Sequence, residues 1–252
     1  MITVKNLQKS FDGKQVLKDI SMSFRPGECN MLIGASGSGK TVLLNMLIGL
    51  TEPDSGEIWY GDEEFTRMSE TEKKALHQKI GVLFQGSALF DFRTVLGNIM
   101  FPMDFLTDWS PAEKKERARY LLDKVNVNDS EDKYPDELSG GMQKRVGIAR
   151  AIALNPEYLF CDEPNSGLDP ETSIVIDQLI SSLTKELGIT TIMNTHDMNS
   201  ILEIGDNIGF LHKGTILWEG DRHSILSSDC RQLTDFLCSN TLARNIIRPQ
   251  GR

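Results

Sequence analysis

One glycine-rich segment restricts the fold of this 252-residue chain more than any other part of it. Residues 34–41 read Gly-Ala-Ser-Gly-Ser-Gly-Lys-Thr and fit the pattern G-x-x-x-x-G-K-[ST]. In such a loop the backbone N–H groups surround nucleotide phosphates, Lys40 reaches the β- and γ-phosphate oxygens, and Thr41 offers its hydroxyl to Mg²⁺. An apolar strand, residues 31–33, precedes the loop, and apolar residues with helical spacing follow it at 42–47. This context favours phosphate binding at a helix N-terminus.

The overall composition limits the classes of function. The chain carries a formal net charge of −9, which argues against binding duplex nucleic acid, because neutralising phosphates needs clustered Lys and Arg. No stretch reaches the roughly 18–20 apolar residues of a membrane-spanning helix, and the first residues lack the apolar core of a secretion signal. We therefore expect a cytoplasmic protein whose role at a membrane depends on a partner. The four cysteines form no C-x-x-C pair, so we expect reduced, mostly packed thiols.

Strand and helix patterns predict an α/β fold around a parallel sheet. A turn at residues 11–14 between two strands indicates an antiparallel start, and a second turn is expected at 54–57 before a strand at 58–60. A polar helix then precedes an apolar strand at 80–85, which we expect to end in the amide of Gln85.

The middle of the chain, residues 87–150, is expected to be largely helical. Ser110, Pro111 and Glu113 form a capping box with proline at the first helical position, and a further helix is expected to begin near Met142. The sequence then returns to alternating elements, namely a strand at 158–162, a helix at 173–187, a strand at 189–194 and a hairpin at 208–218.

Polar residues follow the apolar strands, where ligands gather in open α/β sheets. Asp162 can hold Mg²⁺ through water, and Glu163 is placed to polarise a water that attacks a γ-phosphate. The amide of Gln85 is a candidate contact for Mg²⁺ or for that water. A single histidine such as His196 is more often structural, but its place in this set favours a hydrogen bond to the γ-phosphate.

The segment Leu-Ser-Gly-Gly-Met at residues 138–142, about a hundred residues after the first loop, offers more backbone donors. Ser139, Gly140 and Gly141 present N–H groups at the positive end of a helix. Capping the helix explains Ser139. Two adjacent glycines carry an entropic cost that makes sense where another backbone or a phosphate approaches closely. We expect these donors to serve a nucleotide held by another subunit.

Together these motifs resemble the ATP-binding subunit of ABC transporters, over nearly the whole chain. In the family's order they are Walker A at 34–41, the Q-loop at Gln85, the signature at 138–142, Walker B at Asp162 with Glu163, the D-loop Ser166-Gly167-Leu168-Asp169, and the switch His196. The resemblance implies an ATPase coupled to transmembrane transport that uses ATP and Mg²⁺. It also implies a homodimer, arranged head to tail, with two composite sites and a transmembrane permease as partner.

The resemblance assigns a role to each candidate residue. Lys40, Glu163 and His196 are expected to be catalytic, and Thr41, Gln85 and Asp162 to be metal ligands. Phe11 matches the aromatic residue that stacks on adenine, and Val16 would line the same pocket. The nucleotide-binding set is Phe11, Val16, Gly34, Ala35, Ser36, Gly37, Ser38, Gly39, Lys40, Thr41 and Gln85. The residues expected to act on the partner's nucleotide are Ser139, Gly140 and Gly141, with Asp169 in the D-loop.

The implied fold is a P-loop NTPase core with an antiparallel β subdomain and an inserted helical subdomain. We expect the RecA-like ATP-binding core and the β subdomain in residues 1–86 and 151–225, the helical signature subdomain in 87–150, and a C-terminal tail in 226–252. The tail is basic, with Arg244, Arg248 and Arg252.

A finer resemblance concerns the residues after the second apolar strand. Residues 82–91, Val95, Asn98, residues 101–103 and Met142 are similar to the Mla-type, MCE-associated phospholipid transport ATPases. This implies phospholipid trafficking between inner and outer membranes, an MCE lipid-binding protein, a small cytoplasmic regulatory subunit, and a peripheral position on the cytoplasmic face of the inner membrane. The alternatives are the ATPase of an amino-acid importer or of a lipoprotein-releasing system, and a non-transport ABC ATPase, against which the single cassette argues.

The helical segment also carries more apolar side chains than one small helix needs. They are Leu89, Phe90, Phe92, Met100, Phe101, Met103 and Phe105. We expect most of them to form the core of the helical subdomain, and part of the group to form a groove for a helix of the permease.

Overall fold

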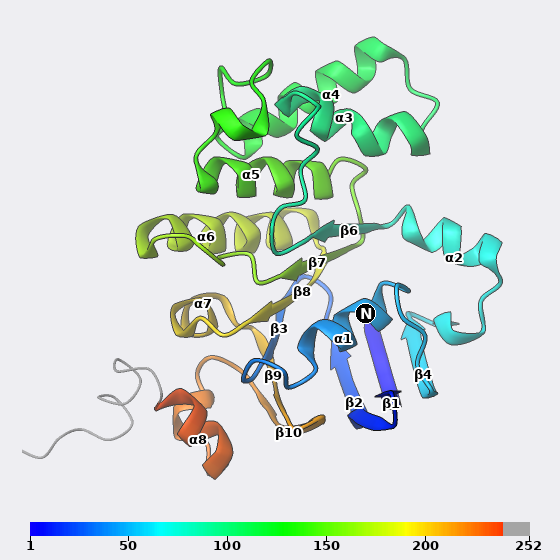
Figure 1. The fold of residues 1–252 in the computed structure, drawn as a ribbon, viewed down its shortest axis with the longest axis vertical. Coiled ribbons are helices and arrows are strands. Elements are labelled where there is room, and N and C mark those ends of the chain that lie inside the picture. Colours follow the sequence, from blue (N-terminus) through cyan, green and yellow to red (C-terminus); the bar gives the residue numbers. More distant parts are fainter. Residues whose placement is uncertain (239–252) are drawn as a thin grey trace, which may run out of the picture. The chain divides into compact units, whose positions relative to one another are not determined.

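The computed structural model describes residues 1–238, which divide into two compact units. The first unit contains Met1–Ser69 and the chain from Thr190 onward, and the second contains Glu70–Ile189. Figure 1 labels their helices and strands. The predicted limits of the subdomains stay a prediction, and the basic tail residues Arg244, Arg248 and Arg252 lie outside the described residues.

The first unit contains an antiparallel sheet and a mainly parallel group of strands. Its elements are β1 (Ile2–Phe11), β2 (Lys14–Phe24), β3 (Cys29–Ile33), α1 (Lys40–Leu47), β4 (Ser55–Tyr60), β5 (Glu63–Glu64), β8 (Thr190–Thr195), α7 (Met198–Ile204), β9 (Asn207–His212), β10 (Thr215–Gly220) and α8 (Arg231–Leu237), with short 3₁₀ turns at Phe65–Arg67 and Ile225–Ser227. The antiparallel sheet has the order β2-β1-β4-β5. β1 and β2 meet at Asp12 and Gly13, both with positive φ, which confirms the predicted turn at residues 11–14.

β3 is the central strand of the parallel group. It pairs with β8 on one side and β9 on the other, both parallel, while β10 pairs antiparallel with β9. All five residues of β3 are buried, as a strand covered on both faces requires. The parallel sheet core predicted from the sequence is confirmed in this unit.

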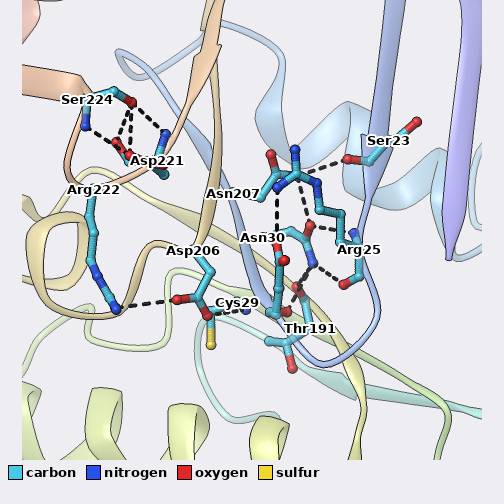
Figure 2. Close-up of polar contacts among 11 residues, drawn as sticks. Ser23, Arg25, Cys29, Asn30, Thr191, Asp206, Asn207, Asp221, Arg222 and Ser224 are labelled. Carbon is cyan, nitrogen blue, oxygen red and sulfur yellow. Dashed lines mark hydrogen bonds and ion pairs between the residues drawn. The ribbon is translucent and has the colours of Figure 1, made fainter.

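A buried polar network fixes the start of β3 (Figure 2). The Asn30 side chain has no exposed surface, and its Oδ1 accepts hydrogen bonds from Arg25 N at 2.7 Å and Asn207 Nδ2 at 2.9 Å. Its Nδ2 donates to the carbonyls of Arg25, Glu28 and Thr191 at 2.9 to 3.0 Å. One amide therefore ties β3 to the end of β2, to β8 and to β9, at the end of the strand opposite the glycine-rich loop.

The second unit is mainly helical, with one parallel strand pair. Its elements are α2 (Glu70–His77), β6 (Ile80–Leu83), α3 (Val95–Leu106), α4 (Pro111–Lys124), α5 (Gly140–Ala151), β7 (Tyr158–Asp162) and α6 (Pro170–Leu187), with a 3₁₀ turn at Pro135–Glu137. β6 and β7 run parallel. The capping box at the start of α4 is present, with Ser110 Oγ accepting from Glu113 N and a Glu113 oxygen accepting from Ser110 N. Residues 87–150 are largely helical, as predicted.

The predicted turn at residues 54–57 is wrong in part, because β4 already begins at Ser55. Gly56 has φ +94°, and a Cβ on it would lie 2.5 Å from the carbonyl oxygen of Asn6 in β1. The glycine is thus explained by the close approach of two paired strands, and its turn-like signal misled the sequence interpretation.

Three predicted boundaries of strands and helices differ from those in the structure. β6 ends at Leu83, so Gln85 follows the strand by two residues and does not end it. α5 begins at Gly140 and not near Met142, because Ser139 caps the helix by accepting from Met142 N at 3.3 Å. α6 begins at Pro170, three residues before the predicted start, because Asp169 caps it. No helix among residues 1–238 is long and apolar enough to cross a bilayer.

Candidate nucleotide-binding site

The glycine-rich loop joins the buried strand β3 to α1. Gly34 follows β3 directly, and a Cβ there would clash with the carbonyl of Leu211 in β9. Gly39, at φ +111°, precedes the helix, and a Cβ there would lie 2.6 Å from Leu17 Cδ2. Glycine is therefore required at both ends of the loop, where the chain passes close to its neighbours and turns into the helix.

Lys40 and Ser38 point polar groups into this loop. Lys40 is buried, and its Nζ donates to the carbonyl oxygens of Gly34 at 2.8 Å and Ala35 at 3.4 Å. Ser38 is also buried, and its Oγ has no hydrogen-bond partner among the described residues. A buried polar group left unpaired costs about 1–3 kcal/mol, so a ligand that pairs with it is favoured. Together with the first N–H groups of α1, these residues fit phosphate oxygens.

His196 lies at the same end of the sheet as the loop. Ile33 in β3 pairs with Thr195 in the parallel strand β8, so Gly34 and His196 leave neighbouring strands at their carboxyl ends. The His196 side chain is exposed. The structure thus places His196, the predicted switch residue, and the glycine-rich loop at the ends of adjacent strands of the first unit.

The predicted adenine contacts lie in the first unit as well. Phe11 ends β1 and is 43% exposed, and Lys9 Nζ lies over its ring, 5.3 Å from the centroid. Lys9 is held in turn by Asp54 at 2.8 Å. Val16 in β2 is half-buried. A partly exposed aromatic ring suits stacking on a base, and the predicted role of Phe11 and Val16 stays a prediction.

The acidic pair and Gln85 lie together in the second unit. Leu83 in β6 pairs with Cys161 in the parallel strand β7, so Gln85, shortly after β6, and Asp162, the last residue of β7, lie at the carboxyl ends of neighbouring strands. Gln85 Nε2 donates to Ser166 Oγ at 3.4 Å. Glu163 has φ +50°, a left-handed conformation that costs a residue with a side chain about 1–2 kcal/mol. Such strain concentrates at functional sites, which is consistent with the role predicted for Glu163.

The two signature glycines have different surroundings. Gly141 is buried, and a Cβ there would lie 2.5 Å from Thr172 Cγ2 in α6, so packing within this unit requires glycine. Gly140 is exposed, and a Cβ there would meet only Leu168 Cδ2 at an ordinary 3.5 Å. Packing within the chain therefore explains the glycine at position 141 but not the glycine at position 140.

Asp169 is the N-cap of α6. Its carboxylate accepts from Thr172 N at 2.9 Å and Thr172 Oγ1 at 2.6 Å. These hydrogen bonds lower the pKa of Asp169. The D-loop therefore ends in a carboxylate that stays ionised and fixed at the start of the helix.

Sequence reasoning missed Lys144. This lysine lies on α5 and is only 5% exposed, and its Nζ donates to the backbone carbonyl of Gln85. Burial lowers its pKa, while Cys161 and Glu163 act in the opposite direction. The sequence carries no signal that distinguishes it from Arg145, the adjacent cation of the same helix.

No group of three or more His, Cys, Asp or Glu side chains within residues 1–238 is arranged to hold a metal ion. The predicted Mg²⁺ ligands Thr41, Gln85 and Asp162 are a hydroxyl, an amide and a carboxylate, which are oxygen donors of the kind that Mg²⁺ takes together with water and phosphate. Their role as metal ligands stays a prediction.

The family follows from comparison of the whole chain with known proteins. The sequence profile described as "ABC transporter" matches residues 17–166. The chain belongs to the ABC transporter family. This ABC cassette is 43% identical over 223 residues to the methionine import ATP-binding protein MetN of Carboxydothermus hydrogenoformans, with 87% of this chain and 66% of that protein covered. It is 37% identical over 251 residues to MetN of Clostridioides difficile, with 100% and 77% covered.

The first of these relatives is longer, and the cassette spans about two thirds of it. Solved structures agree on the fold. The ATP-binding cassette MJ0796, a dimer in a post-hydrolysis state bound to ADP and phosphate, matches with a TM-score of 0.80 and 32% identity over 88% of this chain and 99% of that one. CbiO1 of Clostridium perfringens, part of an ABC transporter complex, matches with a TM-score of 0.83 and 27% identity over 97% and 98%. The predicted fold class is confirmed.

The finer prediction from the sequence is not confirmed. The relatives named above are methionine importers and not Mla-type phospholipid ATPases. They agree with the amino-acid importer that the sequence left open as an alternative. Neither the lipid substrate nor the MCE protein has support from them.

Proposed function

We propose that this chain hydrolyses ATP and thereby powers a membrane permease. The observation that carries the proposal is the phosphate-binding loop of an ABC cassette in which Lys40 Nζ rests on loop carbonyls and the buried Ser38 hydroxyl lacks a partner. Nucleotide phosphates would give both groups oxygen partners. The ADP and phosphate bound to the cassette MJ0796, a structure of the same fold, support this proposal.

The chemistry follows from the residues around the phosphates. Lys40 exchanges its carbonyl partners for β- and γ-phosphate oxygens, a stronger charge-assisted contact, and the loop N–H groups stabilise the charge that develops during transfer. Glu163 takes a proton from water as the water oxygen bonds to the γ-phosphorus and the bond to the β,γ-bridging oxygen breaks. His196 donates to the γ-phosphate. Mg²⁺, held by Thr41, Gln85 and Asp162, would neutralise phosphate charge.

A second copy of the chain completes each site in this proposal. Ser139, Gly140 and Gly141 of one copy donate N–H groups to ATP held by the other, and Asp169 lies in the adjoining D-loop. Gly140 supports this arrangement, because packing within the chain leaves room for a side chain there and gives no reason for glycine. The homodimer agrees with the dimeric cassette MJ0796.

The permease is proposed to dock at a cavity of about 360 Å³ in the second unit. Its walls are mainly apolar, and they are formed by Ile80, Gly81, Val82, Phe84, Ala88, Phe90, Phe101, Pro102, Leu106, Arg150, Ala151 and Leu154. The rings of Phe90 and Phe101 are tilted against each other with centroids 4.5 Å apart. Phe92 and Phe105, which are 76% and 70% exposed, contact this pair. The expectation that most of the seven apolar residues predicted here belong to the core is wrong, because only Met103 is fully buried. We propose that a helix of the permease occupies the cavity.

For the transported substrate, the relatives support an amino acid such as methionine. Phospholipid trafficking, with an MCE protein and a small regulatory subunit, is the second candidate, supported by the residues at 82–103 and by Met142. In either case we propose a peripheral position on the cytoplasmic face of the inner membrane, and no role for nucleic acid.

Two experiments test these proposals. Glu163→Gln should bind ATP but hydrolyse it at least about a hundredfold more slowly, the scale of lost general-base action, and near-normal turnover would refute the role of Glu163. The same variant, purified from native membranes in mild detergent, should retain its partners for mass spectrometry. An amino-acid permease supports import, whereas a permease with an MCE protein and bound phospholipid supports lipid transport and overturns the importer.

A further inference from the structure

One face of α5 holds the short segment that follows β6. Lys144 Nζ donates to the carbonyl of Gln85. One turn later a Cβ on Gly147 would lie 2.8 Å from Leu83 Cδ1 and 3.3 Å from Ser87 Cβ, so the helix backbone packs directly against the segment. Residues 85–88 are therefore fixed from one side by the helix that begins at the signature motif.

Arg150 completes the contact a further turn along α5. Its guanidinium donates to the carbonyls of Ser87 at 2.6 Å and Ala88 at 2.7 Å. Arg150 and Ala88 also line the cavity proposed for the permease. Two cations of one helix thus hold three carbonyls of residues 85–88, and the same segment reaches from Gln85 to the cavity.

The segment held in this way is strained. Ser87 has φ +61° and Ala88 φ +47°, two consecutive left-handed residues that are not glycine, at a cost of about 1–2 kcal/mol each. Ser87 is buried, and its N–H donates to the carbonyl of Phe84 at 2.8 Å. Such a conformation persists only where the surroundings determine it strongly, and α5 supplies those surroundings.

Packing alone does not explain why the buried residue 144 carries a charge. The side chain is 5% exposed, and removing an ammonium group from water costs several kcal/mol. A methionine would fill similar space without that cost. Its hydrogen bond goes to the carbonyl of Gln85, the residue whose amide is proposed to contact Mg²⁺ or the attacking water, and Cys161 and Glu163 favour its charge.

We propose that Lys144 is a positioning residue for ATP hydrolysis, which holds the main chain of Gln85 on the signature helix so that the Gln85 amide is correctly placed. The inference rests on the proposed function of Gln85.

The test compares Lys144→Met with the matched control Arg145→Met in the full chain. Arg145, the next residue on α5, donates to the carbonyls of Val125 and Asn126 and makes no hydrogen bond to residues 85–88. Both variants remove one cation from the same helix. The readouts are kcat and KM for ATP in the presence of Mg²⁺, the melting temperature, and hydrogen exchange of the Ser87 amide.

Lys144→Met is expected to lower kcat at least about tenfold, the effect of a misplaced group, and to leave KM within about twofold. Exchange of the Ser87 amide should quicken at least about tenfold, as local opening becomes easier. Arg145→Met should change neither, and Lys144→Arg should restore most of the activity because it keeps the charged donor.

Two results would overturn the inference. One is a kcat for Lys144→Met within about twofold of the control, with Ser87 exchange unchanged. The other is a lower melting temperature together with a lower kcat, a higher KM and no rescue by Lys144→Arg. That result would mean that Lys144 only stabilises the fold. If the unaltered chain does not hydrolyse ATP, the proposed function fails, whereas the Ser87 exchange still tests whether Lys144 holds the segment.

Discussion

The polar network at the start of β3 allows a quantitative prediction for Asn30→Ala. The substitution removes five hydrogen bonds. Arg25 and Glu28 lie near the surface, so water can replace their lost bonds. The carbonyl of Thr191 and the amide of Asn207 are buried, and each loses a partner at about 1–3 kcal/mol. Because the Asn207 amide keeps its bond to the carbonyl of Ser23, we expect a total loss of about 3 kcal/mol.

The measurement is urea unfolding followed by circular dichroism, with the slope m compared between variants to check that the unfolded reference is unchanged. A double-mutant cycle isolates the bond between Asn30 and Asn207. Asn207→Ala alone should cost less stability than Asn30→Ala. The double variant should lose about 1 kcal/mol less than the sum of the two single losses, because both substitutions remove the same hydrogen bond. A loss below about 1 kcal/mol for Asn30→Ala, or strict additivity, would refute the network as an anchor of β3.

Three further predictions concern single positions of the site. Gly141→Ala should lose about 1–3 kcal/mol of stability by overpacking, whereas Gly140→Ala should leave the melting temperature unchanged or higher and still lower ATP turnover, and full turnover there would contradict a partner contact at Gly140. Ser38→Ala should raise the KM for ATP about fivefold, for one lost hydrogen bond, without lowering the stability of the nucleotide-free chain; equal KM values would show that the hydroxyl does not meet a phosphate. The pKa of Asp169 is lowered mainly by the hydrogen bond from the Thr172 side chain. The stability that this cap contributes is therefore present at neutral pH and is lost as the pH falls through the lowered pKa. Unfolding measured against pH should show this loss in the original chain and not in Asp169→Asn.

Local signals made the fold class and several of its local elements predictable. Three of these signals depend only on residues a few positions apart, and a short stretch of sequence is therefore enough to recognise them. They are the glycine-rich loop, the hairpin at Asp12 and Gly13, and the capping box at Ser110. Gly56 shows the limit. Its local signal is that of a turn, but its reason is the passing backbone at Asn6, fifty residues earlier in the chain, and no short window contains both residues.

Lys144 shows the same limit within the site. Lys144 and Arg145 are adjacent cations in a helix, and the sequence gives no way to decide which of them is buried against the Gln85 segment. The packing of α5 on β6 decides it, since the face that carries Gly147 lies against Leu83. A helix that must approach a strand this closely orients its own side chains, and the residue one turn before the glycine is then directed at the Gln85 carbonyl.

The transported substrate lies beyond this kind of inference for a physical reason. In the proposed mechanism the substrate never touches the ATPase subunit, so the loop, the acidic pair and the signature serve every transporter of the family alike. In the same proposal only the surface that meets the permease differs with the substrate, and that surface is the proposed docking cavity lined by Phe90 and Phe101. The relatives that suggest an amino acid and the residues at 82–103 that resemble lipid transporters therefore conflict at this cavity, and the identity of the helix that fills it is what decides between them.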